Sequence, residues 1–287
     1  FEETRFYEQI AKARDASGRQ LLCNPLGEGQ AAIPELVSEK LSTNMVLALQ
    51  KGDYQNRSID IEKLNDVVIE AEEGVRNCRI VLRNAQNIVL RNLDIEQLRA
   101  TESSFVMVDS ACGKIHVENS SGIVHNARAN SIFGNKELKV DHCLVGSIGA
   151  WDTRNIFVRN SILYGASPIG NADYAGSMPC FRFLQSAPAE ISLRNCIVYT
   201  TGILGGNYAE EWRFLGIGQK IGQAGRSYAR LSDMEELLDT EDCWFADPGF
   251  VDPGNGNFNL QFGSPAKGGG RSKLDLGPSP YLEPLRL

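Results

Sequence analysis

Ile88-Val-Leu-Arg-Asn92 is the first of five copies of one short sequence phrase, and these copies predict the architecture. Its outer apolar residues stand two apart, which is the period of a β-strand with one buried face. The run ends at Asn, a residue that tolerates the left-handed backbone of a sharp bend. The other copies are Ile115-His-Val-Glu-Asn119, Leu138-Lys-Val-Asp-His142, Ile156-Phe-Val-Arg-Asn160 and Ile191-Ser-Leu-Arg-Asn195.

The spacing of the copies is typical of a solenoid. Their starts lie 18 to 35 residues apart, so a constant strand phrase is joined by loops of different length. The phrases carry no apolar stripe of helical period, which favours a β-solenoid over a helical one. Because stacked coils lie about 4.8 Å apart, we expect the bend residues to form an asparagine ladder. Its members would be Asn92, Asn119, His142, Asn160 and Asn195.

Two regions differ in pattern. Residues 1–44 are predicted to form a helical cap, because Phe6, Ile10 and Ala13 follow a helical spacing and residues 33–41 have a second helical pattern. Residues 45–287 are predicted to form the solenoid and its closing segment. A cover over the end of a β-solenoid is expected, since an open end is an unpaired sheet edge.

Charge and composition exclude several partners. The chain has 29 Lys and Arg against 36 Asp and Glu, a net charge of −7, which disfavours nucleic acid. We expect no membrane span, because no apolar stretch approaches about 18 residues. The sequence starts at Phe without a signal segment, so we expect a processed product or a piece of a longer protein. The seven cysteines are scattered without zinc-site spacing, and most are predicted to be buried thiols.

Three segments near the C-terminus carry a family resemblance. They are Asp242-Cys-Trp-Phe-Ala-Asp-Pro-Gly-Phe-Val-Asp252, Asn257-Phe-Asn-Leu-Gln-Phe-Gly-Ser-Pro-Ala266 and Asp275-Leu-Gly277. Together with the repeats, they resemble the pectate-lyase-like superfamily over roughly residues 45 to 280. The resemblance implies an all-β fold, a right-handed single-stranded parallel β-helix with short N-terminal capping helices. It also implies a secreted or cell-surface location.

The resemblance gives two hypotheses for function. The first is a carbohydrate-active or carbohydrate-binding protein whose partner is a polysaccharide of the uronate-containing class, with lyase or epimerase chemistry favoured over hydrolysis. The second is a non-catalytic surface, adhesion or protein-binding module of a longer protein. Hydrolysis is disfavoured because the combined set of Asp, His-Gly and Arg-x-Lys motifs that polygalacturonases use is missing from the sequence.

The resemblance also places the ligand along the parallel sheet, beneath segments that interrupt the repeat at 125–130, 164–179 and 199–213. Elimination from a uronate needs a base and a cation that neutralises the carboxylate, and Arg pairs with carboxylates in bidentate geometry. No clear acidic cluster supports a Ca²⁺ cofactor, so this cofactor stays open and no metal ligand is assigned. The predicted catalytic residues are His125, Arg128 and Arg182, and the predicted substrate-binding residues are Asp173, Tyr174, Trp212 and Arg213.

Overall fold

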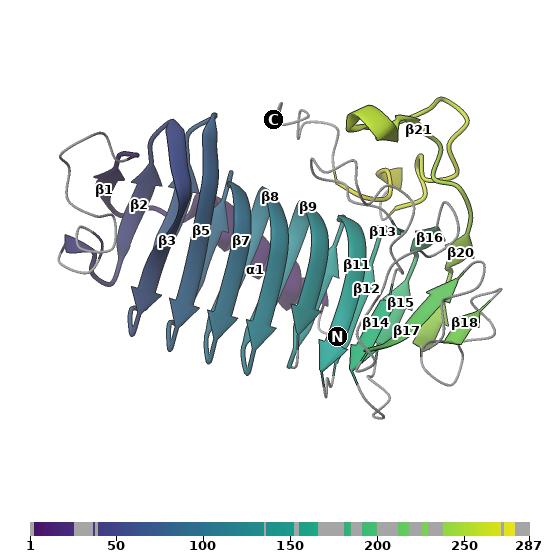
Figure 1. Ribbon diagram of the computed structural model, residues 1–287, viewed down its shortest axis with the longest axis horizontal. Coiled ribbons are helices and arrows are strands. Elements are labelled where there is room, and N and C mark those ends of the chain that lie inside the picture. The colour runs from purple at the N-terminus through teal and green to yellow at the C-terminus, as the bar shows by residue number, and fades with distance from the viewer. Residues whose placement is uncertain are drawn as a thin grey trace. The chain divides into compact units, whose positions relative to one another are not determined.

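A parallel β-solenoid of about six turns forms the protein, which confirms the all-β parallel β-helix (Figure 1). The computed structural model describes residues 3–25, 37, 40–134, 136–151, 155–165, 181–184, 191–199, 212–217, 226–228, 238–270 and 273–278. The chain divides into two compact units, Phe1–His125 and Asn126–Leu287. Within the described residues, no helix is long and apolar enough to cross a membrane.

Unit 1 contains two stacks of parallel strands. One stack runs β1–β2–β4–β6–β8 and the other β3–β5–β7–β8, so that β8 belongs to both. The strands are β1 (Arg19–Cys23), β2 (Met45–Leu49), β3 (Gly52–Glu62), β4 (Val68–Ala71), β5 (Val75–Arg83), β6 (Ile88–Arg91), β7 (Asp94–Thr101) and β8 (Ser104–Glu118). Since β1 pairs with β2, the solenoid sheet already includes residues before 45.

The core of unit 1 follows from the alternation within these strands. Inward residues stack in register from coil to coil, as in the column of Ile59, Ile80, Leu98 and Ile115, each of which is fully buried. Neighbouring coils in this column bring together side chains far apart in sequence, and the apolar area they remove from water stabilises the stack.

The bends have left-handed backbone, and the serines after them accept hydrogen bonds from the preceding coil. Asn92 and Asp109 share one corner, with φ of 53° and 49°. The buried Ser110 that follows accepts a hydrogen bond from the backbone N–H of Leu93 at 3.1 Å. Asn119, predicted to stack with Asn92, instead lies at another corner with Glu102. The reason is that both strands of a coil end in a similar phrase, so the repeat alone does not separate the two corners.

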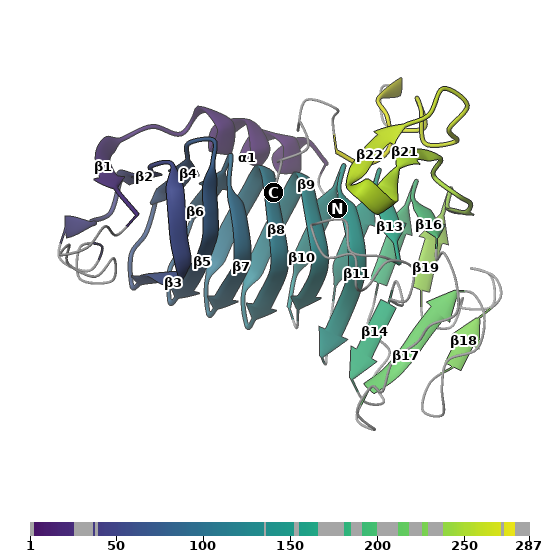
Figure 2. The ribbon, with the colours of Figure 1, turned by 45° about the horizontal axis from the view of Figure 1, so that its top comes forward.

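Helix α1 (Glu3–Asp15) confirms the helix predicted from Phe6, Ile10 and Ala13, but not its place. These three residues pack against Val108 and Ile123, and so α1 covers the flank of the coils of β6 and β8, as Figure 2 shows. The second predicted helix, at 33–41, falls largely outside the described residues.

Unit 2 repeats the two-stack pattern. β10, β12, β15 and β19 pair in parallel in one stack, and β11, β13, β16 and β20 pair in the other. The strands are β10 (Leu138–Asp141), β11 (Leu144–Trp151), β12 (Ile156–Arg159), β13 (Ile162–Tyr164), β14 (Phe181–Leu184), β15 (Ile191–Arg194), β16 (Ile197–Tyr199), β17 (Trp212–Ile217), β18 (Arg226–Tyr228), β19 (Leu238–Glu241) and β20 (Trp244–Phe245). The boundary between the units falls within β9 (Ser121–Gly134).

The C-terminal segment packs on the second stack of unit 2. It forms an antiparallel hairpin of β21 (Phe250–Asp252) and β22 (Asn257–Leu260), joined by the 3-10 turn η3 (Pro253–Asn255). The motif residues Phe250, Phe258, Ala266 and Leu276 are buried together with Leu144, Ile162 and Ile197. The segments that carry the family resemblance therefore supply the apolar residues that close this unit.

Candidate functional site

His125, the predicted base, is buried beneath helix α1. Its side chain is 8% exposed, and its ring packs edge-on against Tyr7 with the centroids 6.3 Å apart. The loop expected at residues 125–130 is absent, because these residues form part of β9, where Ala127 and Ala129 are buried by the alternation of the strand. In this structure the imidazole faces a helix rather than a cleft.

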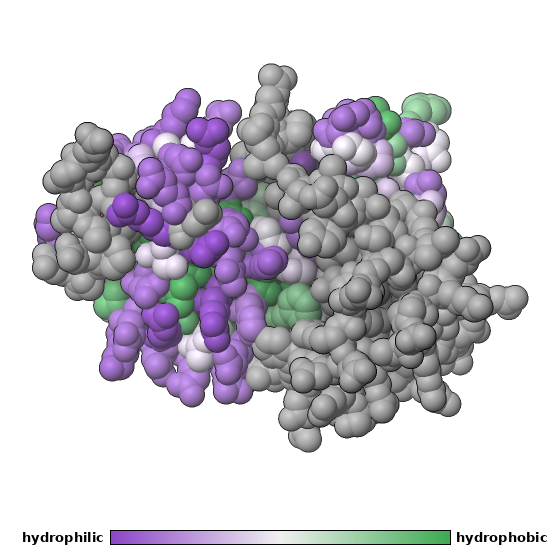
Figure 3. All heavy atoms as spheres, viewed as in Figure 1, coloured by the Kyte–Doolittle hydropathy of each residue, from purple (hydrophilic) through white to green (hydrophobic). Residues whose placement is uncertain are grey.

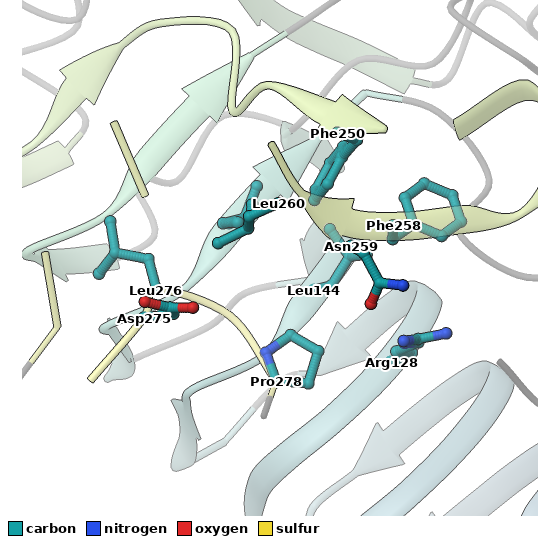
Figure 4. A pocket seen from close by; sticks show the side chains of 10 residues that line it. Arg128, Leu144, Phe250, Phe258, Asn259, Leu260, Asp275, Leu276 and Pro278 are labelled. Carbon is teal, nitrogen blue, oxygen red and sulfur yellow. The ribbon is translucent and has the colours of Figure 1, made fainter. Parts of the chain in front are cut away.

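Arg128, the second predicted catalytic residue, lines a small cavity in unit 2. Figure 4 shows its guanidinium near Asn259 of the C-terminal hairpin, with Asp275 and Pro278 on the other walls. Burial lowers the pKa of Arg128. The cavity measures about 30 Å³, which is room for about one or two water molecules rather than for a sugar ring.

The remaining predicted residues lie elsewhere in unit 2. Arg182 is in β14, which pairs with β17, and the backbone register sets Arg182 opposite Phe214 and Arg213 opposite Phe183. Trp212 begins the same strand β17. The structure therefore brings the backbones of Arg182, Trp212 and Arg213 together, whereas Asp173 and Tyr174 lie outside the described residues.

A buried polar network occupies one corner of unit 2. The carboxylate of Asp141, which is fully buried, accepts hydrogen bonds from Asn160 Nδ2 at 2.8 Å and from Arg159 Nε at 3.1 Å. His142 Nδ1 lies 3.1 Å from the same carboxylate. Asn195 Nδ2 donates to Asn160 Oδ1 at 2.9 Å, so one amide pair of the expected ladder is in contact. Several partners around one buried charge give this network a structural role at the corner.

The outward face of β7 and β8 in unit 1 carries a different group of polar residues. Arg99 pairs in register with His116, and the neighbouring row pairs Gln97 with Lys114. Arg99 and Lys114 are exposed, and His116 is partly exposed. We call Arg99, Lys114 and His116 the basic row. Hydrophilic residues predominate over β3, β5 and β7 on this side of the unit, with apolar patches between them (Figure 3).

Arginines next to the basic row form closer ion pairs than Arg99 does, so their charges are more fully neutralised. Arg79 forms a two-pronged pair with Glu96 at 2.8 and 2.9 Å, and Arg83 lies 2.8 Å from Asp60. Arg99 reaches Glu118 only at 3.5 Å, and its side chain is 52% exposed. Since such a long and exposed contact contributes little, Arg99 can exchange Glu118 for another anion at small cost.

The imidazole of His116 is held in its neutral form. Burial lowers its pKa, and the positive charge of Arg99 lowers it further, while Glu118 acts in the opposite direction. At neutral pH this side chain is therefore a base that can accept a proton, placed directly beside a guanidinium.

Sequence reasoning missed the basic row, although a signal for it was present. Ile115-His-Val-Glu alternates apolar and polar residues, which is typical of a strand with one open face. Phe105-Val-Met-Val is apolar throughout, which is typical of a strand covered on both faces, and here the second cover is α1. The contrast between these two runs indicates which face of the solenoid stays open.

Comparison with known proteins adds no relative to this picture. The chain matches no family model, and it matches no curated protein.

Proposed function

We propose that this protein is a carbohydrate-binding β-helix that holds a uronate-containing polysaccharide along the outward face of β7 and β8. The observation that carries the proposal is the basic row, in which Arg99 and Lys114 are exposed on adjacent coils of one open sheet face. A guanidinium binds a carboxylate through two parallel hydrogen bonds, and an ammonium adds a compact positive charge. Gln97 and Thr101, also on this face, have groups that bond to sugar hydroxyls.

The size of the site favours this face over the cavity at Arg128. Successive coils of a parallel sheet lie about 4.8 Å apart. Side chains on neighbouring coils can therefore contact successive parts of an extended polysaccharide that lies across the coils. The cavity at Arg128 holds about 30 Å³, and residues of the C-terminal hairpin form part of its walls. The catalytic roles of His125, Arg128 and Arg182 stay predictions.

The binding test uses the whole protein and polygalacturonate in isothermal titration calorimetry. We expect Arg99→Ala and Lys114→Ala each to weaken binding by about fivefold to twentyfold, and added salt to weaken it further. Lys12→Ala is the matched control, because Lys12 is an exposed residue of α1 away from this face, and it should leave affinity unchanged. An equal loss of affinity in all three variants, or no binding of any uronate polymer, would contradict the proposal.

A second candidate function is β-elimination on the same polymer, and the neutral imidazole of His116 favours it. His116 would take the C5 proton next to the uronate carboxylate, and Arg99 would stabilise the charge that develops on that carboxylate. The bond from C4 to the glycosidic oxygen then breaks as the C4–C5 double bond forms, and the leaving oxygen takes a proton from water. The test is the rise in ultraviolet absorbance from unsaturated products. His116→Ala should abolish this rise and leave polymer binding within about twofold of the parent protein. Binding without any rise in absorbance would reject the lyase and leave the binding module.

A further inference from the structure

Cys196 and Cys243 occupy the same position in successive coils of unit 2. Each follows a bend residue with left-handed backbone, Asn195 for the first and Asp242 for the second. The strands on both sides pair in register, since Arg194 faces Glu241 and Ile197 faces Trp244. The backbone N–H of Trp244 donates to the carbonyl of Cys196 at 2.9 Å. The coil spacing of about 4.8 Å is within the Cα separation that a disulfide spans.

The two thiols are in contact and differ in their surroundings. They are hydrogen-bonded to each other. Cys196 is fully buried, whereas Cys243 is partly exposed, so an oxidant from solvent can reach only the second. Both thiols also point to the carbonyl two residues before them, Cys196 to Arg194 at 3.3 Å and Cys243 to Glu241 at 3.3 Å. The side chains therefore project to the same side of the stack.

The chemistry of the pair is asymmetric. The hydrogen bond from the Cys196 thiol lowers the pKa of Cys243, and the charge of Arg194 acts in the same direction. Burial raises the pKa of Cys196 well above its ordinary value. Since the thiolate is the nucleophile, Cys243 is the sulfur that reacts first.

We propose that Cys196 and Cys243 are a site of oxidative modification at which a disulfide joins the coil of β15 and β16 to the coil of β19 and β20. A small-molecule disulfide such as oxidised glutathione is the oxidant. The Cys243 thiolate attacks one of its sulfurs, forms a mixed disulfide and releases one glutathione thiolate. Cys196 then loses its proton and attacks Sγ of Cys243, which releases the second glutathione. Two protein thiols are oxidised by two electrons, and one glutathione disulfide is reduced to two thiols.

The other described cysteines lack the combination of a directly stacked partner thiol and a partly exposed sulfur with a lowered pKa. Cys143 is buried, and its neighbour at the equivalent position of the next coil is Ser161, whose Oγ accepts from the Cys143 backbone N–H at 3.0 Å. Burial raises the pKa of Cys112 and of Cys143 to about 12. These thiols are therefore poor nucleophiles at neutral pH, and the reaction is selective for the pair that stacks directly.

The experiment treats the reduced protein with oxidised glutathione and counts thiols after denaturation. We expect two of the seven thiols to disappear, peptide mapping to find Cys196 linked to Cys243, and Tm to rise by several degrees because the cross-link restricts the unfolded chain. Dithiothreitol should restore all seven thiols and the original Tm.

Three variants make the result specific. In Cys243→Ser, the two thiols should no longer disappear. In Cys196→Ser, Cys243 should remain as a mixed disulfide with glutathione, because Cys196 is not there to displace the glutathione. Cys143→Ser is the matched control, because it removes a stacked cysteine without touching the pair, and it should still lose two thiols. The proposal is overturned if the parent protein stops at a glutathione adduct on Cys243, or if peptide mapping finds either cysteine linked to a different partner.

Discussion

The left-handed bend residues set the path of the chain at the scale of single residues. Asn92, Asp109, Asn160 and Asn195 have φ between 48° and 55°, a region that costs most residues about 1–2 kcal/mol and costs Asn and Asp less. A buried Ser or Cys follows many of these bends, and Ser110 and Ser161 each accept a backbone N–H from the preceding coil. The bend and the hydrogen bond after it thus turn the strand inward without leaving a buried donor unpaired.

At the same scale, the carboxyl of Asp94 makes stability depend on pH. Burial raises the pKa of Asp94 from 3.8 to about 6. The folded protein therefore holds this proton more tightly than the unfolded chain, so the contribution of Asp94 is most favourable at low pH and is lost as pH rises through about 6. We expect Asp94→Asn to raise the free energy of unfolding by about 1–3 kcal/mol at about pH 7.5 and to have little effect at about pH 4.

Urea unfolding of Asp94→Asn and of the parent protein at both pH values measures this difference. Glu73→Gln serves as a control, because Glu73 is exposed in a turn, and it should change stability little at either pH. An equal increase in the free energy of unfolding at both pH values would show that the charge of the Asp94 carboxyl does not cause the increase.

At the scale of elements, α1 decides which face of the solenoid is open. Its apolar stripe of Phe6, Ile10 and Ala13 covers outward residues of the stack, and Arg14 fixes the helix to Asp109 by two hydrogen bonds of 2.8 and 2.9 Å. The helix buries His125 on this flank, while the face of the basic row has no cover among the described residues of unit 1. The docking of α1 therefore buries His125 as a packing residue and leaves His116 available to a ligand.

Truncating the buried side chain of Phe6 should loosen helix α1 and expose His125. We expect Phe6→Ala to lower the free energy of unfolding by about 3–5 kcal/mol, since Phe6 is 2% exposed. Modification of His125 by diethylpyrocarbonate, followed by peptide mass spectrometry, should become faster than in the parent protein. Glu8→Ala, an exposed change on the same helix, should alter neither quantity. Rapid modification of His125 in the parent protein would contradict the packing described here.

At the scale of the whole molecule, each coil contacts its neighbours and little else, as in other solenoids. The C-terminal hairpin closes unit 2 through the cluster of Phe250 and Phe258 against Ile162 and Ile197. The rings of Phe250 and Tyr164 meet edge-on at 5.2 Å, which adds directional contact to the apolar burial. Perturbing this closure should therefore act first on the coils that it touches.

Hydrogen exchange followed by mass spectrometry tests this locality. We expect Phe250→Ala to cost about 3–5 kcal/mol and to raise exchange in β13 and β16, while β5 keeps its protection. Val251→Ala is the matched control, because the adjacent Val251 is 51% exposed, and it should leave exchange unchanged. Equal loss of protection in β5 would mean that the chain unfolds as one cooperative body.

The amino-acid sequence alone predicted the strands of the five repeat copies, their parallel stacking and the apolar residues of the closing segment. It did so because strand alternation, bend residues such as Asn92 and the run from Asp242 to Asp252 are local patterns. Three outcomes follow from tertiary packing instead: Asn119 turns a different corner from Asn92, His125 is buried, and Cys196 meets Cys243. These outcomes depend on which outward face a helix covers and on the register between coils, and both are set by contacts between residues far apart in the chain.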